Sequence, residues 1–176
     1  MRYAAFMAAV LCVGVTRAEE LPKDTNEIKT LTVTQAKELA QHQKYRLALN
    51  GLTTLSEEAA KELAQCKGSW LSLNGLTTLS DEAAKTLAQY KGGLSLNGLT
   101  TLSDEAAKEL AQCKGSWLSL NGLTTLSDEA AKTLAQYKGG LSLNGLTTLS
   151  DEAAKELAQC KGSWLSLNGL TTLSDE

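Results

Sequence analysis

The chain repeats one short pattern along most of its length, and this repetition limits what it can fold into. An Asn-Gly pair recurs at intervals of 24, 23, 24, 23 and 24 residues, beginning at Asn50, Asn74, Asn97, Asn121, Asn144 and Asn168. Residues 74–120 are identical to residues 121–167, so two slightly different units form a 47-residue block that occurs twice. A fixed period of this size predicts a solenoid, in which each unit packs only against its neighbours.

An altered copy of the unit lies upstream of the first Asn-Gly pair. Residues 36–41 match residues 60–65 at an offset of 24, which places the first unit at Asn26, with Glu27 in place of the glycine. The outer face of a terminal unit meets water instead of a neighbour, so an altered first unit is expected. The resulting assignment is a short leader at 19–25, a degenerate capping repeat at 26–49, five further units at 50–167, and an incomplete repeat at 168–176 that suggests truncation.

Each unit has the pattern of a short strand, a turn, a short helix and a second turn. Residues 71–73 alternate Leu-Ser-Leu as a strand does, and the Asn-Gly pair that follows tolerates a positive φ, at which the chain would leave the strand direction. Ser80 is a good helix N-cap before two acidic residues, and residues 83–88 carry an apolar stripe. We expect parallel strands in one sheet, with the helices opposite, at residues 47–49, 71–73, 94–96, 118–120, 141–143 and 165–167.

The unit resembles the leucine-rich repeat family, and most closely its cysteine-containing subclass and bacterial units of the same length. The matches lie at Leu71, Leu73, Leu79, Ser80, Asp81, Leu87 and Ala88. The resemblance implies an α/β leucine-rich-repeat solenoid with a parallel β-ladder on the concave side and short helices on the convex side. Leu76 stands where the family has a buried Asn or Cys, which predicts that the usual side-chain ladder is missing and that water or neighbouring amides satisfy the loop backbone.

The N-terminus has the features of a secretory signal peptide. Residues 3–15 form an apolar run that is too short to cross a bilayer, and the small residues Thr16 and Ala18 precede two acids. We therefore predict a signal peptide at 1–18, cleaved after Ala18, and a secreted, periplasmic or cell-envelope protein without a membrane span after cleavage. An uncleaved anchor or an ordinary buried helix is the alternative.

Composition argues against several classes of function. The 17 basic side chains are outnumbered by 20 acidic ones, so no nucleic-acid partner is expected. His42 is the only histidine, and every serine belongs to a set of copies, so no catalytic residue, cofactor or enzymatic activity is expected. The paired acids at the helix starts have the positions of caps and helix ion-pair partners. An enzyme would require a further domain beyond Glu176.

The cysteines of the repeats occupy one helix-end position. Cys66, Cys113 and Cys160 are two units apart, and two steps of about 4.8 Å exceed the separation that a disulfide allows. The same spacing argues against a zinc site. We expect small, partly buried thiols, and the alternative is intermolecular pairing into a disulfide-linked dimer.

Tryptophan marks the candidate site. The 24-residue units have Gly-Ser-Trp before the strand, where the 23-residue units have Gly-Gly. Strand alternation turns the Trp, Ser and Asn side chains toward the concave face, with tryptophans about 9.6 Å apart. Each indole either packs over the neighbouring glycine or joins a stacking platform for a repetitive ligand. The candidate ligand-binding residues are Trp70, Ser72, Asn74, Trp117, Ser119, Asn121, Trp164, Ser166 and Asn168.

These features favour an exported binding or interaction scaffold with a repetitive concave surface. Any chemical group in one 47-residue block recurs in the next, which is unlike a catalytic site. The expected partner is a protein, a peptide or a polysaccharide. The alternatives are a purely structural envelope or surface spacer, and a non-catalytic part of a larger protein with a further C-terminal domain.

Overall fold

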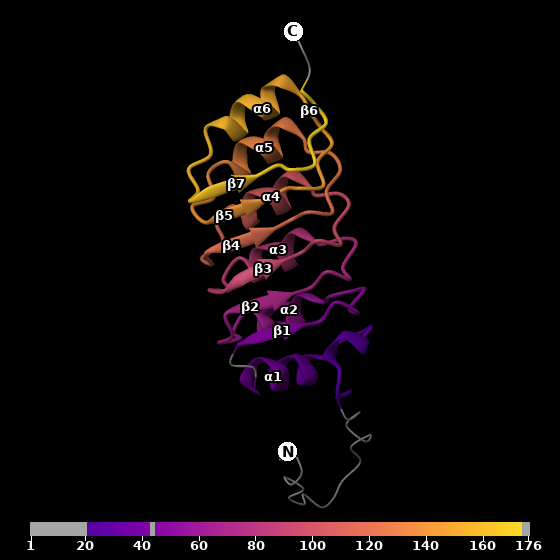
Figure 1. The fold of residues 1–176 in the computed structure, drawn as a ribbon. Coiled ribbons are helices and arrows are strands. Elements are labelled where there is room, and N and C mark those ends of the chain that lie inside the picture. The colour runs from indigo at the N-terminus through magenta and orange to yellow at the C-terminus, as the bar shows by residue number, and fades with distance from the viewer. Residues whose placement is uncertain (1–20, 43–44, 174–176) are drawn as a thin grey trace, which may run out of the picture.

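The chain folds as a repeat solenoid with a sheet on one side and a stack of helices on the other (Figure 1). The computed structural model describes residues 21–42 and 45–173, so the predicted signal peptide lies outside the described residues. Six strands pair in parallel in the order β1-β2-β3-β4-β5-β7. They are β1 Arg46–Ala48, β2 Trp70–Ser72, β3 Gly93–Ser95, β4 Trp117–Ser119, β5 Gly140–Ser142 and β7 Trp164–Ser166.

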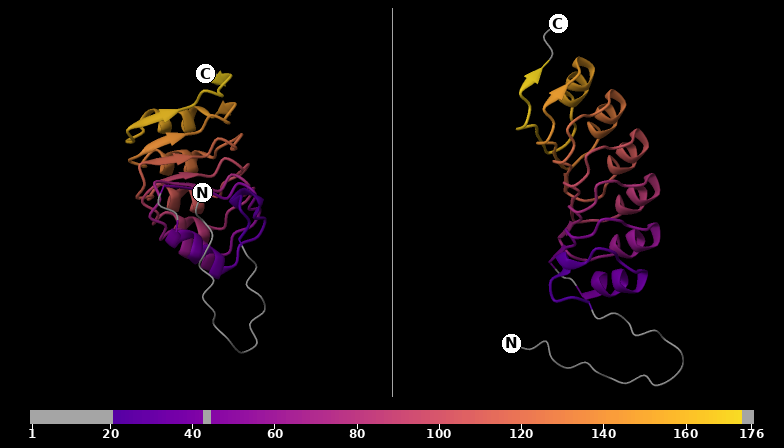
Figure 2. Two further views of the ribbon diagram at one scale, coloured as in Figure 1. Left: turned by 60° about the horizontal axis from the view of Figure 1, so that its bottom comes forward. Right: turned by 90° about the vertical axis from the view of Figure 1, so that its right-hand side faces the viewer.

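The helices are stacked in sequence order behind this sheet. They are α1 Val33–His42, α2 Glu57–Leu63, α3 Asp81–Leu87, α4 Asp104–Leu110, α5 Asp128–Leu134 and α6 Asp151–Ala158. A 3-10 turn, η1 Thr25–Glu27, precedes α1, and two short strands, β6 Thr148–Leu149 and β8 Thr172–Leu173, pair outside the main sheet. The stack bends gently, with the sheet on its inner side and the helices on its outer side (Figure 2).

The predicted fold class and the single parallel sheet are confirmed. Each strand begins and ends one residue earlier than predicted, because the residue before the first leucine already takes part in pairing. The Gly93 amide donates to the Ser69 carbonyl at 2.8 Å, and Leu71 is in register with Leu94.

Leucine and alanine build one continuous core between the sheet and the helices. Leu71, Leu73 and Leu76 are fully buried from the strand side, and Ala83 and Leu87 from the helix side. Neither half of a unit covers its own apolar face, so stability comes from stacking.

The helix starts confirm the expected capping and link one helix to the next. The Ser103 hydroxyl accepts from the Ala106 amide at 3.0 Å and donates to Asp81, the first residue of the preceding helix. Ser127 and Asp104 repeat this contact, as do Ser150 and Asp128. The serines therefore cap the helices, and the first-turn aspartates join neighbouring units. On the exposed surface Lys108 pairs with Glu105 at 3.3 Å, and equivalent pairs follow in α5 and α6.

The glycine of each Asn-Gly pair has a different role from the one predicted. None of these glycines has a φ in the left-handed region. Instead, a Cβ on Gly98 would lie 2.2 Å from the carbonyl oxygen of Asn74 in the preceding unit, and one on Gly75 would lie 2.3 Å from that of Asn50. Glycine is required because the backbones of adjacent units approach closely here.

We expect Gly98→Ala to lower the free energy of unfolding by about 1–3 kcal/mol or more, since the added methyl group pushes two backbones apart. Urea unfolding followed by circular dichroism measures this change. Thr100→Ala, an exposed position two residues away, is the matched control and should change stability by about 0.5 kcal/mol or less. Equal stability of the two variants would show that close approach does not explain this glycine.

Candidate functional site

The inner face of the sheet carries the residues predicted for ligand binding. Strand alternation holds at the first candidate strand, where Leu71 points into the core while Trp70 and Asn74 are half-buried on the other side. Ser72 differs from expectation, since it is only 1% exposed. The reason lies in a hydrogen-bonded ladder that runs along this face.

The ladder joins one asparagine and one serine of each unit to the next unit. The Asn74 Oδ1 atom accepts from the Ser95 hydroxyl at 2.7 Å and from the Asn97 backbone amide at 2.9 Å. The Asn97 Nδ2 group donates back to the Ser95 hydroxyl at 3.1 Å. Asparagines accept in this way at positions 50, 74, 97, 121 and 144.

The expectation based on Leu76 is therefore wrong. A side-chain ladder is present, but the asparagine two residues earlier supplies it while Leu76 fills the core. Asn26 belongs to the ladder as well, because its Oδ1 atom accepts from the Asn50 amide at 3.1 Å. Asn26 thus takes the position in the ladder that Asn50 and the later asparagines take.

The ladder limits what the polar candidates can offer to a partner. The hydroxyls of Ser72 and Ser119 are buried, and each donates and accepts within the ladder. In the last described unit Ser166 is half-buried and donates to Asn144, while Asn168 is exposed. Ligand contact through the buried hydroxyls would require the ladder to break, so the accessible parts of the predicted site are its tryptophans and its asparagines.

The three tryptophans form one column on the inner face. The ring centroids of Trp70 and Trp117 are 6.0 Å apart, and those of Trp117 and Trp164 are 4.2 Å apart in an edge-on arrangement. The predicted spacing of about 9.6 Å is therefore wrong for the rings. Trp70 and Trp164 both lean across an intervening strand toward Trp117.

Glycine makes room for this leaning, which confirms for Trp70 and Trp164 the interpretation that the indoles pack over glycines. A Cβ on Gly93 would lie 2.5 Å from Trp70 Cε3, and one on Gly140 would lie 2.3 Å from Trp164 Nε1. At the N-terminal end of the column, the Arg46 guanidinium lies 5.9 Å from the Trp70 ring centroid, a cation–π distance.

Two indole N–H groups in the column are buried without an acceptor. Trp70 Nε1 and Trp117 Nε1 have no hydrogen-bond partner among the described residues. A buried unpaired donor costs about 1–3 kcal/mol. Trp164, at the C-terminal end of the column, is 36% exposed.

Cysteine and tyrosine alternate at the helix-end position that begins with His42. Cys66, Cys113 and Cys160 form no disulfide within the described part of the chain. Burial raises the pKa of the Cys113 thiol to about 12. Burial, with a smaller effect from the neighbouring cysteine, also raises the pKa of Tyr90 and Tyr137 above the usual value. Their hydroxyls donate to the carbonyls of Gly68 and Gly115 at 2.7 and 2.9 Å.

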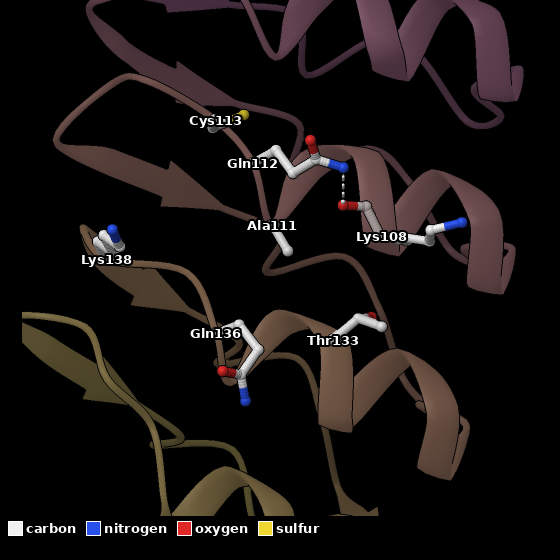
Figure 3. A pocket seen from close by; sticks show the side chains of 7 residues that line it. All are labelled: Lys108, Ala111, Gln112, Cys113, Thr133, Gln136 and Lys138. Carbon is white, nitrogen blue, oxygen red and sulfur yellow. Dashed lines mark hydrogen bonds between the residues drawn. The ribbon is translucent and has the colours of Figure 1, made fainter.

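Sequence reasoning missed a second surface, which we call the Lys-Gln edge. It lies where each helix ends, and it comprises the repeated Gln-x-Lys residues with their neighbours. Cavities of about 470, 800 and 230 Å³ lie along it. The cavity of about 470 Å³ is lined by Gln136 and Lys138 from the segment after α5 and by Lys108 from α4 (Figure 3). The side-chain amide of Gln112, which also lines it, donates to the Lys108 carbonyl at 3.4 Å. The signal that could have revealed this edge was the Gln-x-Lys motif, present in five units.

Comparison with known proteins does not assign the chain to a family. No family model matches it, and no curated protein matches it. Within residues 21–42 and 45–173, no helix is long and apolar enough to cross a membrane. Over the same ranges, no three or more His, Cys, Asp or Glu side chains come together as a metal site would require.

Alkaline pH should destabilise the fold through the buried thiol and phenols. In the unfolded chain, Cys113 loses its proton at about pH 8.5 and the tyrosines lose theirs at about pH 10, the usual pKa values. In the folded chain, the pKa values of Cys113, Tyr90 and Tyr137 are higher, so these groups stay protonated to higher pH. The stabilisation is therefore complete below about pH 8.5 and is lost as pH rises toward the folded-state values. Urea unfolding midpoints at pH 7.5, 9, 10 and 11 should fall steadily.

The paired variant Tyr90→Phe/Tyr137→Phe should show a shallower fall with pH, because two of the three groups are removed. Tyr45→Phe, at an exposed position, is the control and should keep the steeper wild-type fall. A midpoint that stays constant to pH 11 in the wild-type protein would contradict this account.

Proposed function

We propose that the chain is a non-catalytic binding scaffold of the leucine-rich repeat family, and that an extended partner docks along its tryptophan column. The family assignment is supported by the Leu-x-Leu, Ser-Asp and Leu-Ala positions of each unit, together with the parallel ladder and the outer helices. The column is supported as the docking surface by its place on the sheet, which forms the inner side of the curve (Figure 2).

The observation that carries the proposal is the pair of unsatisfied indole donors. A column that only filled space above glycine would be more stable with an apolar ring, since Trp70 Nε1 and Trp117 Nε1 gain nothing by being buried. A partner with acceptor oxygens beside a flat apolar face would satisfy these donors once an indole turns outward. Peptides and polysaccharides both have that combination of groups.

We further propose that the protein works outside the cytoplasm, as a secreted, periplasmic or cell-envelope component. The support is the predicted signal sequence at residues 1–18. A scaffold there would act by holding a partner on a rigid repeated surface, without a catalytic group or cofactor of its own.

A structural spacer is the second candidate, and one specific observation favours it. The Asn-Ser ladder satisfies the polar groups of the inner face internally, which is what a purely architectural stack requires. In that case the tryptophans would act only as packing over Gly93 and Gly140.

Replacing indole by phenyl separates these two functions. We expect Trp70→Phe/Trp117→Phe to keep or raise the free energy of unfolding, because it removes two unpaired donors, and to weaken partner binding by about tenfold or more, equivalent to roughly 1.4 kcal/mol. Binding is measured by indole fluorescence and pull-down with peptidoglycan, insoluble glycans and envelope proteins. Trp164→Phe, at the exposed end of the column, controls for the loss of any one indole.

The proposal fails if none of these partners shifts the wild-type fluorescence and the double variant retains all partner binding. It also fails if the double variant is strongly destabilised, since the donors would then be satisfied in the folded protein. Either result would favour the spacer.

A further inference from the structure

The Lys-Gln edge has a row of unpaired positive charges. One exposed lysine per unit occupies the same position after the helix, at Lys67, Lys91, Lys114, Lys138 and Lys161. Among the described residues, no ion pair joins any of these five to a carboxylate. The lysines within the helices differ, because those of α4, α5 and α6 each pair with a glutamate three residues earlier.

Charge is separated across the solenoid although the whole chain is acidic. Paired acids, such as Asp104 and Glu105, lie in the first turn of each helix from α2 to α6, and the helices are stacked in the same order and orientation. The lysine row lies beyond the opposite helix ends. The first-turn acids therefore lie at the edge away from the row, whereas Glu62, Glu109 and Glu156 lie near the ends of α2, α4 and α6, on the row's side of these helices.

The row is partly fixed in position by contacts between units. The Lys114 ammonium donates to Gln89 Oε1 of the preceding unit, and Lys161 makes the same bond to Gln136. An ammonium has three donors, so a bond to a neutral amide leaves its charge and its other donors available to an anion.

Two of the three cavities along this edge have the chemistry of an anionic sugar site, whereas Glu62 lines the third and smallest one. The largest, about 800 Å³, is lined by lysines, hydroxyls and amides of three successive units, including Lys67, Lys91, Lys114, Gln89, Ser69 and Ser116, and no carboxylate lines it. The cavity of about 470 Å³ continues the edge into the next units, again without a carboxylate (Figure 3). Ammonium groups with interspersed hydroxyls and amides suit a chain that bears both anionic groups and hydroxyls.

We propose that the Lys-Gln edge binds a linear acidic polysaccharide, with one anionic group for each lysine of the row. This site is separate from the tryptophan column. The observations favour a polysaccharide over a nucleic acid for two reasons. The row contains no arginine, the side chain that best matches a phosphate, and no aromatic side chain lines the three cavities for stacking on bases.

The chain itself supplies a matched pair of variants for the test. Lys91→Gln/Lys114→Gln/Lys138→Gln removes three charges from the row, and Lys85→Gln/Lys132→Gln/Lys155→Gln removes three from the exposed helix surface. Both variants have the same net charge and keep the Leu and Ala core. The probes are heparin and polygalacturonate as acidic polysaccharides, dextran as a neutral one, and single-stranded oligo-dT, with binding measured by calorimetry at 50 and 150 mM salt.

We expect the wild-type protein to bind heparin or polygalacturonate at 50 mM salt, more weakly at 150 mM salt, and not to bind dextran. The row variant should bind at least tenfold more weakly with a flatter salt dependence, while the helix variant stays within about twofold of wild type. Absence of binding to both acidic probes at 50 mM salt would overturn the proposal. Equal losses in the two variants, or tighter binding of oligo-dT than of either polysaccharide, would overturn it as well.

Discussion

The close approach of one unit's glycine to the asparagine carbonyl of the unit before it sets the geometry of the whole stack. A side chain at Gly75, Gly98 or Gly122 would occupy the space that this carbonyl oxygen already fills. Contact at this distance brings the asparagine amide within reach of the next serine and the next backbone N–H, so the ladder follows from it. The leucines on either side then meet in register and close the core.

Two kinds of unit alternate because their side chains fill space for each other. The Tyr90 hydroxyl passes above Gly92 and donates to the carbonyl of Gly68. A side chain on Gly92 would collide with this hydroxyl. Trp70 covers Gly93 of the next unit in a similar way. Each bulky aromatic residue therefore requires a glycine beside it, in its own unit for Tyr90 and in the next unit for Trp70. The 47-residue block, more than the single unit, is therefore the structural repeat, and its surface carries both an aromatic column and a lysine row.

Sequence reasoning could predict whatever depends on period and pattern. The leucine spacing was sufficient for the parallel sheet, and Ser80 was sufficient for a helix start. It could not predict why glycine is required at position 98, nor that Ser72 is buried. Both depend on how closely neighbouring units pack, and the sequence of a single unit does not give that distance. The leaning of Trp164 toward Trp117 also depends on a neighbouring strand. The lysine row was visible as a motif, but its lack of carboxylate partners required the fold.

The most direct test of this account is the stability of Asn97→Ala. Asn97 accepts from the Ser119 hydroxyl and the Asn121 amide in the middle of the ladder, and removing its side chain leaves both donors without their acceptor. Each unsatisfied group costs about 1–3 kcal/mol, so urea unfolding should show a loss of about 2 kcal/mol or more. The same change at the exposed Gln112 should have little effect. A loss below about 0.5 kcal/mol for Asn97→Ala, the scale of an ordinary surface substitution, would contradict the claim that the ladder holds the units together.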